Sequence, residues 1–221
     1  MNVFITGASS GIGEGLAKHY ASGGCHIGLV ARRREMLESL ATDLRMRGAE
    51  PHIYAGDVVD TAFMARSAQD FARAAGSVDL VVANAGIGVP GTAIGEGKSE
   101  DIAHLMRVNV IGVTNTIVPF VPILVAQKSG VLSAVSSMAG HRALPGRTAY
   151  SASKAAVLVF MDGLRMELED SGVHAMTFCP GFVRTPLTAT NQGMMFVISV
   201  DDAVRAMVDA VSARLDTVTF P

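Results

Sequence analysis

Short apolar runs alternate along this chain with longer stretches in which apolar residues recur at helical spacing. The short runs predict strands at Asn2–Thr6, His26–Ala31, Glu50–Ala55, Leu80–Ala83, Gly130–Val135 and His174–Cys179, with a candidate seventh at Thr217–Phe220. The longer stretches predict helices at Ile12–Ser22, Arg34–Arg47, Thr61–Ala75, Ser99–Gln127, Ala149–Ser171 and Val200–Ala213. Strands that alternate with helices of this length are typical of βαβ units and of a parallel sheet.

The predicted strands are apolar at consecutive positions rather than at every second position. This pattern indicates a sheet that is covered by helices on both faces. We therefore expect an α/β fold with a doubly wound parallel sheet, and a length of 221 residues fits a single domain over residues 1–221. In such a sheet the ligand binds beyond the carboxyl ends of the strands, so the residues that follow each strand are the most informative about function.

Composition narrows the classes of function. Apolar residues make up 49% of the chain and charged residues 17%, which excludes an intrinsically disordered protein. The formal net charge is −2 and the sequence has no basic tract, so we expect no nucleic-acid partner. Aromatic residues are only 5% and tryptophan is absent, which argues against a surface for stacking single-stranded bases.

The sequence also bears on the cellular compartment and on metals. We expect a cytoplasmic protein, because the N-terminal residues have neither the basic region nor the cleavage site of a signal peptide. The apolar stretch Val108–Gln127 contains Asn109 and Pro119, so a helix buried in an α/β core explains it better than a membrane span. Cys25 and Cys179 are far apart, as is typical of reduced core cysteines. The six histidines share no metal-ligand spacing, and we expect no metal.

A glycine-rich turn follows the first predicted strand and opens the first predicted helix. It reads Thr6-Gly7-Ala8-Ser9-Ser10-Gly11-Ile12-Gly13. Gly7 permits the tight turn, Gly11 lets the backbone approach a pyrophosphate, and Gly13 allows the helix to pack closely on the strand. The diphosphate of a dinucleotide would then lie at the helix N-terminus, where free N–H groups favour an anion.

With the spacing T-G-x-x-x-G-x-G, the chain resembles the short-chain dehydrogenase/reductase family in its single-domain form. The resemblance extends from Asn2 to Thr185, with the expected motifs in order. It implies a Rossmann fold, oxidoreductase activity, and a homodimer or homotetramer formed through the helices near Ser99–Gln127 and Ala149–Ser171. The turn residues expected at the cofactor are Gly7, Ser9, Ser10, Gly11, Ile12 and Gly13.

Arginines follow the second predicted strand, near the point where enzymes that prefer NAD(H) carry an acidic residue. That position is Ala31 here, and Arg32 and Arg33 follow at once. A carboxylate would repel a 2′-phosphate, whereas a guanidinium binds it through paired charge-assisted hydrogen bonds. We therefore predict NADP(H) rather than NAD(H), with Arg32 as the main contact, Arg33 as the second, and Ser9 assisting. The alternative is a basic helix start that is simply solvated.

Polar and small residues follow the later predicted strands. Taken singly, each group would be ordinary turn chemistry. The resemblance assigns Asp57 and Val58 to the adenine and the backbone of Val183 to the nicotinamide carboxamide. The complete set that it places at the cofactor after these strands is Asp57, Val58, Asn84, Ala85, Gly86, Pro180, Gly181, Val183 and Thr185.

Three residues carry the candidate chemistry. Tyr150 and Lys154 are four positions apart on a predicted helix, so both project from one face. A phenol with an ordinary pKa of about 10 is a poor base at neutral pH, and a nearby ammonium group favours its ionised form. Ser137, at the end of the fifth predicted strand, can donate a hydrogen bond to a substrate oxygen on which charge develops. The resemblance adds Lys154 as a ligand of the nicotinamide ribose, and Asn109, which in the family holds a water that relays protons to the lysine.

Together these residues predict reversible hydride transfer between NADP(H) and a small carbonyl or alcohol substrate, with Tyr150 as general acid and base. Three alternatives stay open. One is a non-catalytic dinucleotide-binding sensor or scaffold, and another is an epimerase or dehydratase of the larger extended branch, for which the chain after Thr185 is short. The third is a structural oligomer without a ligand, against which the glycine turn argues. We expect residues 186–199 to form a substrate flap, and its apolar side chains, which suggest an apolar substrate, are Leu187, Met194, Met195 and Phe196.

Overall fold

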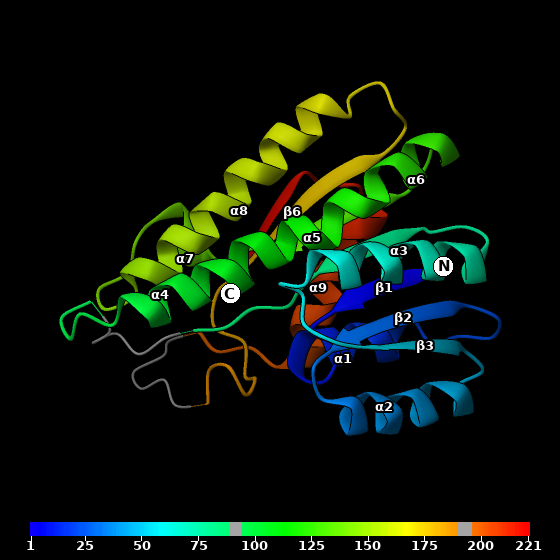
Figure 1. Ribbon diagram of the computed structural model, residues 1–221, viewed down its shortest axis with the longest axis horizontal. Coiled ribbons are helices and arrows are strands. Elements are labelled where there is room, and N and C mark those ends of the chain that lie inside the picture. The colour runs from blue at the N-terminus through cyan, green and yellow to red at the C-terminus, as the bar shows by residue number, and fades with distance from the viewer. Residues whose placement is uncertain (89–93, 190–195) are drawn as a thin grey trace.

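A seven-stranded parallel sheet forms the centre of the protein in the computed structural model, which describes residues 1–88, 94–189 and 196–221 (Figure 1). The strand order is β3-β2-β1-β4-β5-β6-β7. The strands are β1 (Val3–Thr6), β2 (His26–Ala31), β3 (Glu50–Ala55), β4 (Leu80–Ala83), β5 (Val131–Val135), β6 (His174–Pro180) and β7 (Thr217–Phe220). The chain winds outward from β1 to β3 and then returns to place β4 beside β1, so the carboxyl ends of β1 and β4 mark the switch point of the sheet.

Helices cover both faces of this sheet (Figure 1). One face carries α1 (Gly11–Tyr20), α2 (Arg34–Met46) and α9 (Val200–Ser212). The other carries α3 (Thr61–Ala75), a long helical run from Ser99 to Gln127, and α8 (Thr148–Glu167). A short helix, α7 (Met138–His141), follows β5. Each face buries its own apolar cluster, so the sheet lies between two hydrophobic cores.

The first strand shows how one apolar run serves both cores. Successive side chains of a strand point to opposite faces of the sheet. Val3 and Ile5 pack into the core beneath α1, α2 and α9, whereas Phe4 packs into the core beneath α3 and α8. The centroid of the Phe4 ring lies 5.4 Å from that of Phe71 and 4.8 Å from that of Phe120. The strand therefore needs apolar residues at consecutive positions, which is the pattern that the sequence shows.

The structure confirms the predicted doubly wound sheet, including the seventh strand. The predicted strand ends agree with the observed ones to within one residue. The helices differ more, because α8 ends at Glu167 whereas the sequence predicts Ser171. Gly172 has a φ of 81°, and the preceding residues form turns rather than a last helical turn. The chain therefore leaves the helix early to enter β6.

The run predicted as one helix over Ser99–Gln127 is helical over the whole of that range, but it is not a regular α-helix throughout. It consists of α4 (Ser99–Met106), a π-helical turn η1 (Arg107–Ile111), α5 (Gly112–Ile117), a 3₁₀ turn η2 (Val118–Phe120) and α6 (Val121–Gln127). Pro119 and Pro122 lack the backbone N–H that a regular helix needs, which accounts for the break at η2. The π-helical turn contains Asn109, one of the predicted site residues.

By length and composition, the Ser99–Gln127 run is the one helix in the described part of the chain that could cross a membrane. Half of its most apolar stretch is nevertheless buried inside the protein. Val113, Ile117 and Leu124 belong to the core beneath α3 and α8. This packing is typical of the core helix of an α/β domain.

Candidate active site

A cavity of about 320 Å³ opens along the carboxyl edge of the sheet, at the switch point between β1 and β4. Ligand sites of small molecules begin at about this size. The predicted site residues that line it are Gly7, Ser9, Ser10, Gly11, Ile12, Arg32, Arg33, Asp57, Val58, Asn84, Ala85, Gly86, Ser137, Tyr150, Lys154, Pro180, Gly181, Val183 and Thr185. Gly13 and Asn109 are the two predicted residues that do not line it. One cavity thus joins residues that the chain separates by more than a hundred positions.

The glycine-rich turn between β1 and α1 forms one wall of the cavity. Gly7 and Gly11 have φ angles of 69° and 60°, a left-handed conformation that disfavours any other residue. An added Cβ at Gly11 would lie 3.1 Å from Cγ2 of Thr185, so the bare backbone leaves room at this wall. Ser10 precedes α1, and its side chain caps none of the first N–H groups of the helix. The turn therefore offers backbone donors and a positive helix end to an anion.

Gly13 supports this turn from behind. An added Cβ there would lie 2.4 Å from the backbone oxygen of Gly7 and 2.7 Å from Nδ2 of Asn84. The close packing of α1 against the first strand explains why the position lacks a side chain. Gly13 therefore has the packing role that the sequence predicts, and its contact with a cofactor stays a prediction.

Thr6 and Asn84 join the ends of β1 and β4 at the switch point. Nδ2 of Asn84 donates to the backbone oxygen of Thr6 at 2.9 Å. Oγ1 of Thr6 in turn accepts from the backbone N–H of Asn84 at 3.2 Å and of Ala85 at 3.3 Å. The sequence points to Asn84 but not to Thr6, whose position just before the glycine turn was the available signal. This pair fixes the separation of the two strands that flank the cavity.

Two arginines follow β2 and form a basic corner of the cavity. Nη2 of Arg33 donates to Oγ of Ser9 at 3.0 Å and to Oγ of Ser10 at 3.3 Å. Arg32 extends the other way, with Nη1 3.9 Å from a carboxylate oxygen of Asp57. The last residue of β2 is Ala31, so no carboxylate lies at the end of this strand. Arg33 rather than Arg32 is thus the guanidinium that lies against the glycine turn.

Tyr150, Lys154 and Ser137 meet on the opposite wall. Tyr150 and Lys154 lie one turn apart on α8, and Nζ of Lys154 is 5.7 Å from the centre of the Tyr150 ring. Ser137 precedes α7, and its Oγ accepts from the backbone N–H of Ala139 at 3.1 Å. The Ser137 hydroxyl is also hydrogen-bonded to the Tyr150 hydroxyl. The phenol and the serine therefore present their oxygens to the same space.

Lys154 carries a charge that the fold buries. Its side chain is 3% exposed, and Nζ donates to the backbone oxygen of Val135 at 2.8 Å. Burial lowers the Lys154 pKa from 10.5 to about 8, and the nearby thiol of Cys179 opposes this shift. Oγ of Ser136 donates to the Lys154 backbone oxygen at 2.7 Å and anchors α8 to the end of β5. Lys154 is thus held at the floor of the cavity and stays protonated at neutral pH.

The Tyr150 hydroxyl keeps its proton in the protein alone. Burial raises the Tyr150 pKa above its ordinary value of 10.0. The hydrogen bond from Ser137 and the positive charge of Arg147 act in the opposite direction but do not outweigh burial. The sequence predicts that the Lys154 ammonium group lowers this pKa, whereas in the protein alone desolvation sets the direction of the shift.

Asn109 lies behind the cavity wall, in the π-helical turn. The residue is fully buried. Its Oδ1 accepts from the backbone N–H of Ile87 at 2.8 Å. Its Nδ2 donates to the backbone oxygen of Ile87 at 3.0 Å and to Oγ of Ser153 at 3.0 Å. A Cβ added at Gly86 would lie 3.4 Å from both Oδ1 of Asn109 and Nζ of Lys154. Asn109 therefore connects the end of β4 to α8. Because Gly86 has no side chain, Asn109 lies close to Lys154.

The segment 186–199, predicted as a substrate flap, is described at both of its ends. Leu187 lines the cavity, and Oγ1 of Thr188 donates to the backbone oxygen of Val183 at 2.6 Å. At the far end, Ile198 pairs with Val183 in an isolated parallel bridge. Met194 and Met195 lie outside the described residues, and Phe196 is 80% exposed. Flap closure stays a prediction.

Comparison with known proteins gives a consistent picture. The family model of the short chain dehydrogenases matches residues 1–195. An "Uncharacterized oxidoreductase" of Myxococcus xanthus is 37% identical over 219 residues, which is 98% of this chain and 86% of that protein. A short-chain dehydrogenase of Sphingobium yanoikuyae in complex with NADPH superposes with a TM-score of 0.90 at 28% identity, over 99% of this chain and 87% of that one. A family member from Burkholderia phymatum in complex with NAD gives a TM-score of 0.90 at 26% identity, over 98% and 87%.

We predict that Lys154→Met stabilises the folded protein at neutral pH. The pKa of about 8 means that the folded chain holds a buried charge at pH 7 which the unfolded chain would solvate. The free energy of unfolding should rise by about 1–3 kcal/mol, where the upper value follows from the pKa shift and the lower from the lost hydrogen bond to Val135. The gain should shrink as the pH rises from about 8 to 10.5, because there the unfolded wild type binds more protons than the folded one.

Urea denaturation at about pH 7 and about pH 10 measures this effect. Lys128→Met, at an exposed position, is the matched control and should change the free energy of unfolding little at either pH. A Lys154→Met protein that is no more stable than the wild type at neutral pH would contradict the prediction.

Proposed function

The chain belongs to the short-chain dehydrogenase family, and we propose that it is an NADP(H)-dependent oxidoreductase that interconverts a small carbonyl compound and its alcohol. One observation carries this proposal. The Tyr150 phenol, the Ser137 hydroxyl and the Lys154 ammonium group share a single cavity with the glycine-rich turn. This arrangement combines a place for a dinucleotide with a proton donor beside it.

The residues present fit a nicotinamide dinucleotide. The left-handed glycines keep side chains off the wall, the first turn of α1 offers uncapped N–H groups, and Arg33 adds a positive charge beside them. These features suit a diphosphate at the turn. Gly181 and Val183 line the same cavity as Tyr150, and we place a carboxamide at the backbone of Val183. A bound nicotinamide dinucleotide would supply or accept the hydride.

The residues of the chain itself handle the proton and the charge. In the reducing direction, Tyr150 donates the proton of its hydroxyl to the carbonyl oxygen, as general acid catalysis requires. Its raised pKa keeps that proton in place beforehand. Ser137 donates a hydrogen bond to the same oxygen while negative charge develops on it. In the oxidising direction Tyr150 accepts the proton.

Lys154 and Asn109 act behind the phenol. The Lys154 ammonium group, one helical turn from Tyr150, stabilises the phenolate that forms when the proton leaves. We place the nicotinamide ribose hydroxyls at the same Nζ. The proximity of Asn109 Oδ1 to this ammonium group across Gly86 supports the predicted relay of protons through an ordered water. Since both groups are buried, such a water would be held by polar partners on several sides.

Preference for NADP(H) rests on the basic corner after β2. Arg33 already bridges Ser9 and Ser10, so a 2′-phosphate there would find one guanidinium and two hydroxyls. The Arg32 guanidinium lies near Asp57 rather than near the glycine turn, which makes it the second contact rather than the first. With Ala31 at the end of β2, the strand offers no carboxylate to the ribose of NAD(H).

The substrate side of the cavity favours an apolar molecule. Ile87, Val135 and Leu187 line the cavity together with Tyr150. The flap would close over the substrate from the Leu187 side. We also propose a cytoplasmic location, since Cys25 and Cys179 are free thiols.

We predict that Tyr150→Phe lowers kcat by about 100-fold to 10,000-fold, because it removes the general acid and base with little change in volume. Binding of the cofactor, followed by its fluorescence, should persist. The matched control is Tyr20→Phe, because the Tyr20 hydroxyl is buried outside the cavity and has no hydrogen-bond partner among the residues that the structure describes. Turnover of a panel of aldehydes, ketones and alcohols is the measurement.

The outcomes separate the enzyme from its alternative. Turnover by the wild type and Tyr20→Phe, but not by Tyr150→Phe, supports the proposal. Cofactor binding without turnover of any substrate by the wild type would favour a dinucleotide-binding sensor or scaffold. Full activity in Tyr150→Phe would refute the mechanism.

We predict that Arg33→Ala lowers kcat/KM for NADPH by about 10-fold to 100-fold, the loss expected for a hydrogen bond to a charged group. The effect on NADH should be much smaller, because NADH has no 2′-phosphate. Arg32→Ala should give a weaker effect of the same kind. Arg34→Ala is the control, since Arg34 pairs with Glu38 on α2 and does not line the cavity. A wild type that prefers NADH would overturn the cofactor assignment.

An apolar stripe on the outer helices supports a homodimer or homotetramer. Ile111, Val118 and Val125 are 45%, 52% and 38% exposed and lie seven positions apart, on one side of the Ser99–Gln127 run. Val159 and Met166, also seven apart, are 72% and 77% exposed on α8. α8 packs against α4 and η1 of this run, and we propose that the five side chains belong to one association surface, which we call the outer stripe. Exposed apolar patches of this kind mark association surfaces.

We predict that Met166→Glu weakens self-association, because it places a charge on the apolar surface that a second copy would cover. Light scattering coupled to gel filtration should give a dimer or tetramer for the wild type and a smaller mass for the variant. Met46→Glu is the matched control, because Met46 is also 77% exposed but lies on α2, across the sheet. A wild type that is monomeric at every concentration would reject the proposal.

A further inference from the structure

Three metal-ligating side chains meet at the amino edge of the sheet, on the opposite side from the cavity. His26 opens β2, Glu50 opens β3, and His52 lies two residues further along β3. The parallel register pairs His26 with Glu50 and Gly28 with His52, so all three side chains stand on the same face. Their nearest ligand atoms all lie within 4.8 Å of one another. Spacing along the chain did not reveal this group, because its members belong to two different strands.

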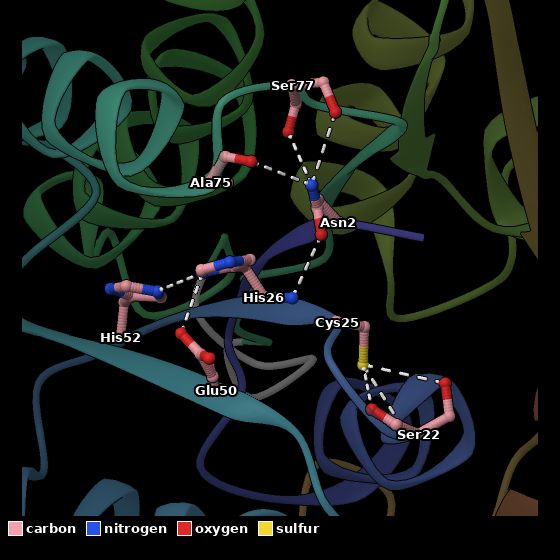
Figure 2. Close-up of polar contacts among 8 residues, drawn as sticks. All are labelled: Asn2, Ser22, Cys25, His26, Glu50, His52, Ala75 and Ser77. Atoms are coloured by element: carbon pink, nitrogen blue, oxygen red, sulfur yellow. Dashed lines mark hydrogen bonds and ion pairs between the residues drawn. The ribbon is translucent and has the colours of Figure 1, made fainter.

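The side chains point at a common centre (Figure 2). Nδ1 of His26 is 2.9 Å from Nε2 of His52 and 3.6 Å from a carboxylate oxygen of Glu50. We propose that His26, Glu50 and His52 form a binding site for a divalent transition-metal cation such as Zn²⁺. Two imidazoles and one carboxylate are a set that zinc accepts, with water in the fourth position.

The distances suit a tetrahedral ion after a small adjustment. Zinc–ligand bonds of about 2.0–2.2 Å put neighbouring ligand atoms about 3.3 Å apart. The observed separations of 2.9 Å and 3.6 Å lie on either side of that value. The shorter one is a hydrogen bond between the two rings, in which one nitrogen carries the proton. The cation would replace that proton, and the two nitrogens would move apart by a few tenths of an ångström.

Hydrogen bonds and ring packing hold the two histidines in place. Oδ1 of Asn2 accepts from the backbone N–H of His26 at 3.0 Å, and Nδ2 of Asn2 donates to the backbone oxygens of Ala75 and Ser77 (Figure 2). The His52 ring packs edge to face on Phe71, with centroids 5.7 Å apart. Ligands that are fixed before the ion arrives lose little conformational freedom on binding.

Access and charge also fit a cation. The side chain of Glu50 is 65% exposed and that of His26 is 20% exposed, so an ion and its water can enter from solvent. Asp70 and Glu50 both exert a negative potential on His52. Cys25 precedes His26 but points away, with its thiol donating to the backbone oxygens of Tyr20 and Ser22. The predicted ligand set therefore contains nitrogen and oxygen but no sulfur.

Titration of the untagged, chelator-treated full chain with ZnCl₂ in a calorimeter tests the proposal. We expect one saturable site per chain and a rise in Tm on addition of zinc. Loss of an outer-shell partner weakens metal binding by about 10-fold to 100-fold. His26→Gln and His52→Gln each remove a direct ligand, so each should weaken zinc binding by at least that factor. Mg²⁺ should not compete, because it prefers oxygen ligands in an octahedral arrangement.

The matched control is His174→Gln. His174 also opens a strand and lies 3.9 Å from a carboxylate oxygen, that of Asp216, but it belongs to no three-ligand group in the described residues. This variant should bind zinc as the wild type does. Co²⁺ provides a second readout, since a site of imidazole and carboxylate gives visible absorption bands without the ultraviolet band of a thiolate ligand.

Two results would overturn the proposal. One is the absence of saturable zinc binding by the wild type, which would leave the two rings sharing only a proton. The other is zinc binding that persists in both His26→Gln and His52→Gln or that shows a thiolate band. Tm values measured without metal verify that the variants are folded. None of these readouts depends on oxidoreductase activity.

Discussion

The parallel direction of all seven strands is the constraint on which the rest of this structure depends. Parallel pairing forces each connection to return over a face of the sheet, so every strand ends at the same edge. The residues that follow β1, β2, β4, β5 and β6 therefore lie close together at this edge. Their meeting point is hollow because the winding direction changes between β1 and β4, where the helices on the two faces separate.

Several groups in this site lower the stability of the folded protein. The Lys154 ammonium group is removed from water and donates to the backbone oxygen of Val135, and the Tyr150 phenol is desolvated as well. Hydrogen bonds in the surrounding fold offset this loss of stability. Ser136 holds the helix that carries Lys154, and Asn109 ties that helix to the end of β4 through Ser153 and Ile87. These hydrogen bonds thus hold the helix that carries Tyr150 and Lys154 in place.

The sequence predicts most of this fold because the local patterns and the final packing agree. Consecutive apolar residues such as Val3, Phe4 and Ile5 require a strand with a core on each side, and the structure provides both. The glycines of the turn are equally local, since Gly7 and Gly11 need their left-handed angles whatever lies around them.

Residues whose role depends on a distant partner are harder to predict. Asn109 occupies a π-helical turn because its amide bonds to Ile87, 22 positions away, and helical spacing alone gives no sign of it. The contact of Arg33, rather than Arg32, with the turn depends on how the chain leaves β2. The group of His26, Glu50 and His52 depends on the register of two strands, which the sequence does not state. The sequence alone does not show which residues of β2 and β3 are paired, so it does not reveal this group.

The two edges of the sheet are connected through β2 and β3. These strands carry Arg33 and Asp57 at their carboxyl ends and the histidine–glutamate group at their amino ends. β3 is one of the two edge strands and pairs only with β2, so it has less support than a strand nearer the centre. The basic corner of the cavity is therefore built beside an edge of the sheet. A metal bridge between β2 and β3 would hold their amino ends together, and a six-residue strand that is fixed at one end has little freedom to shift at the other.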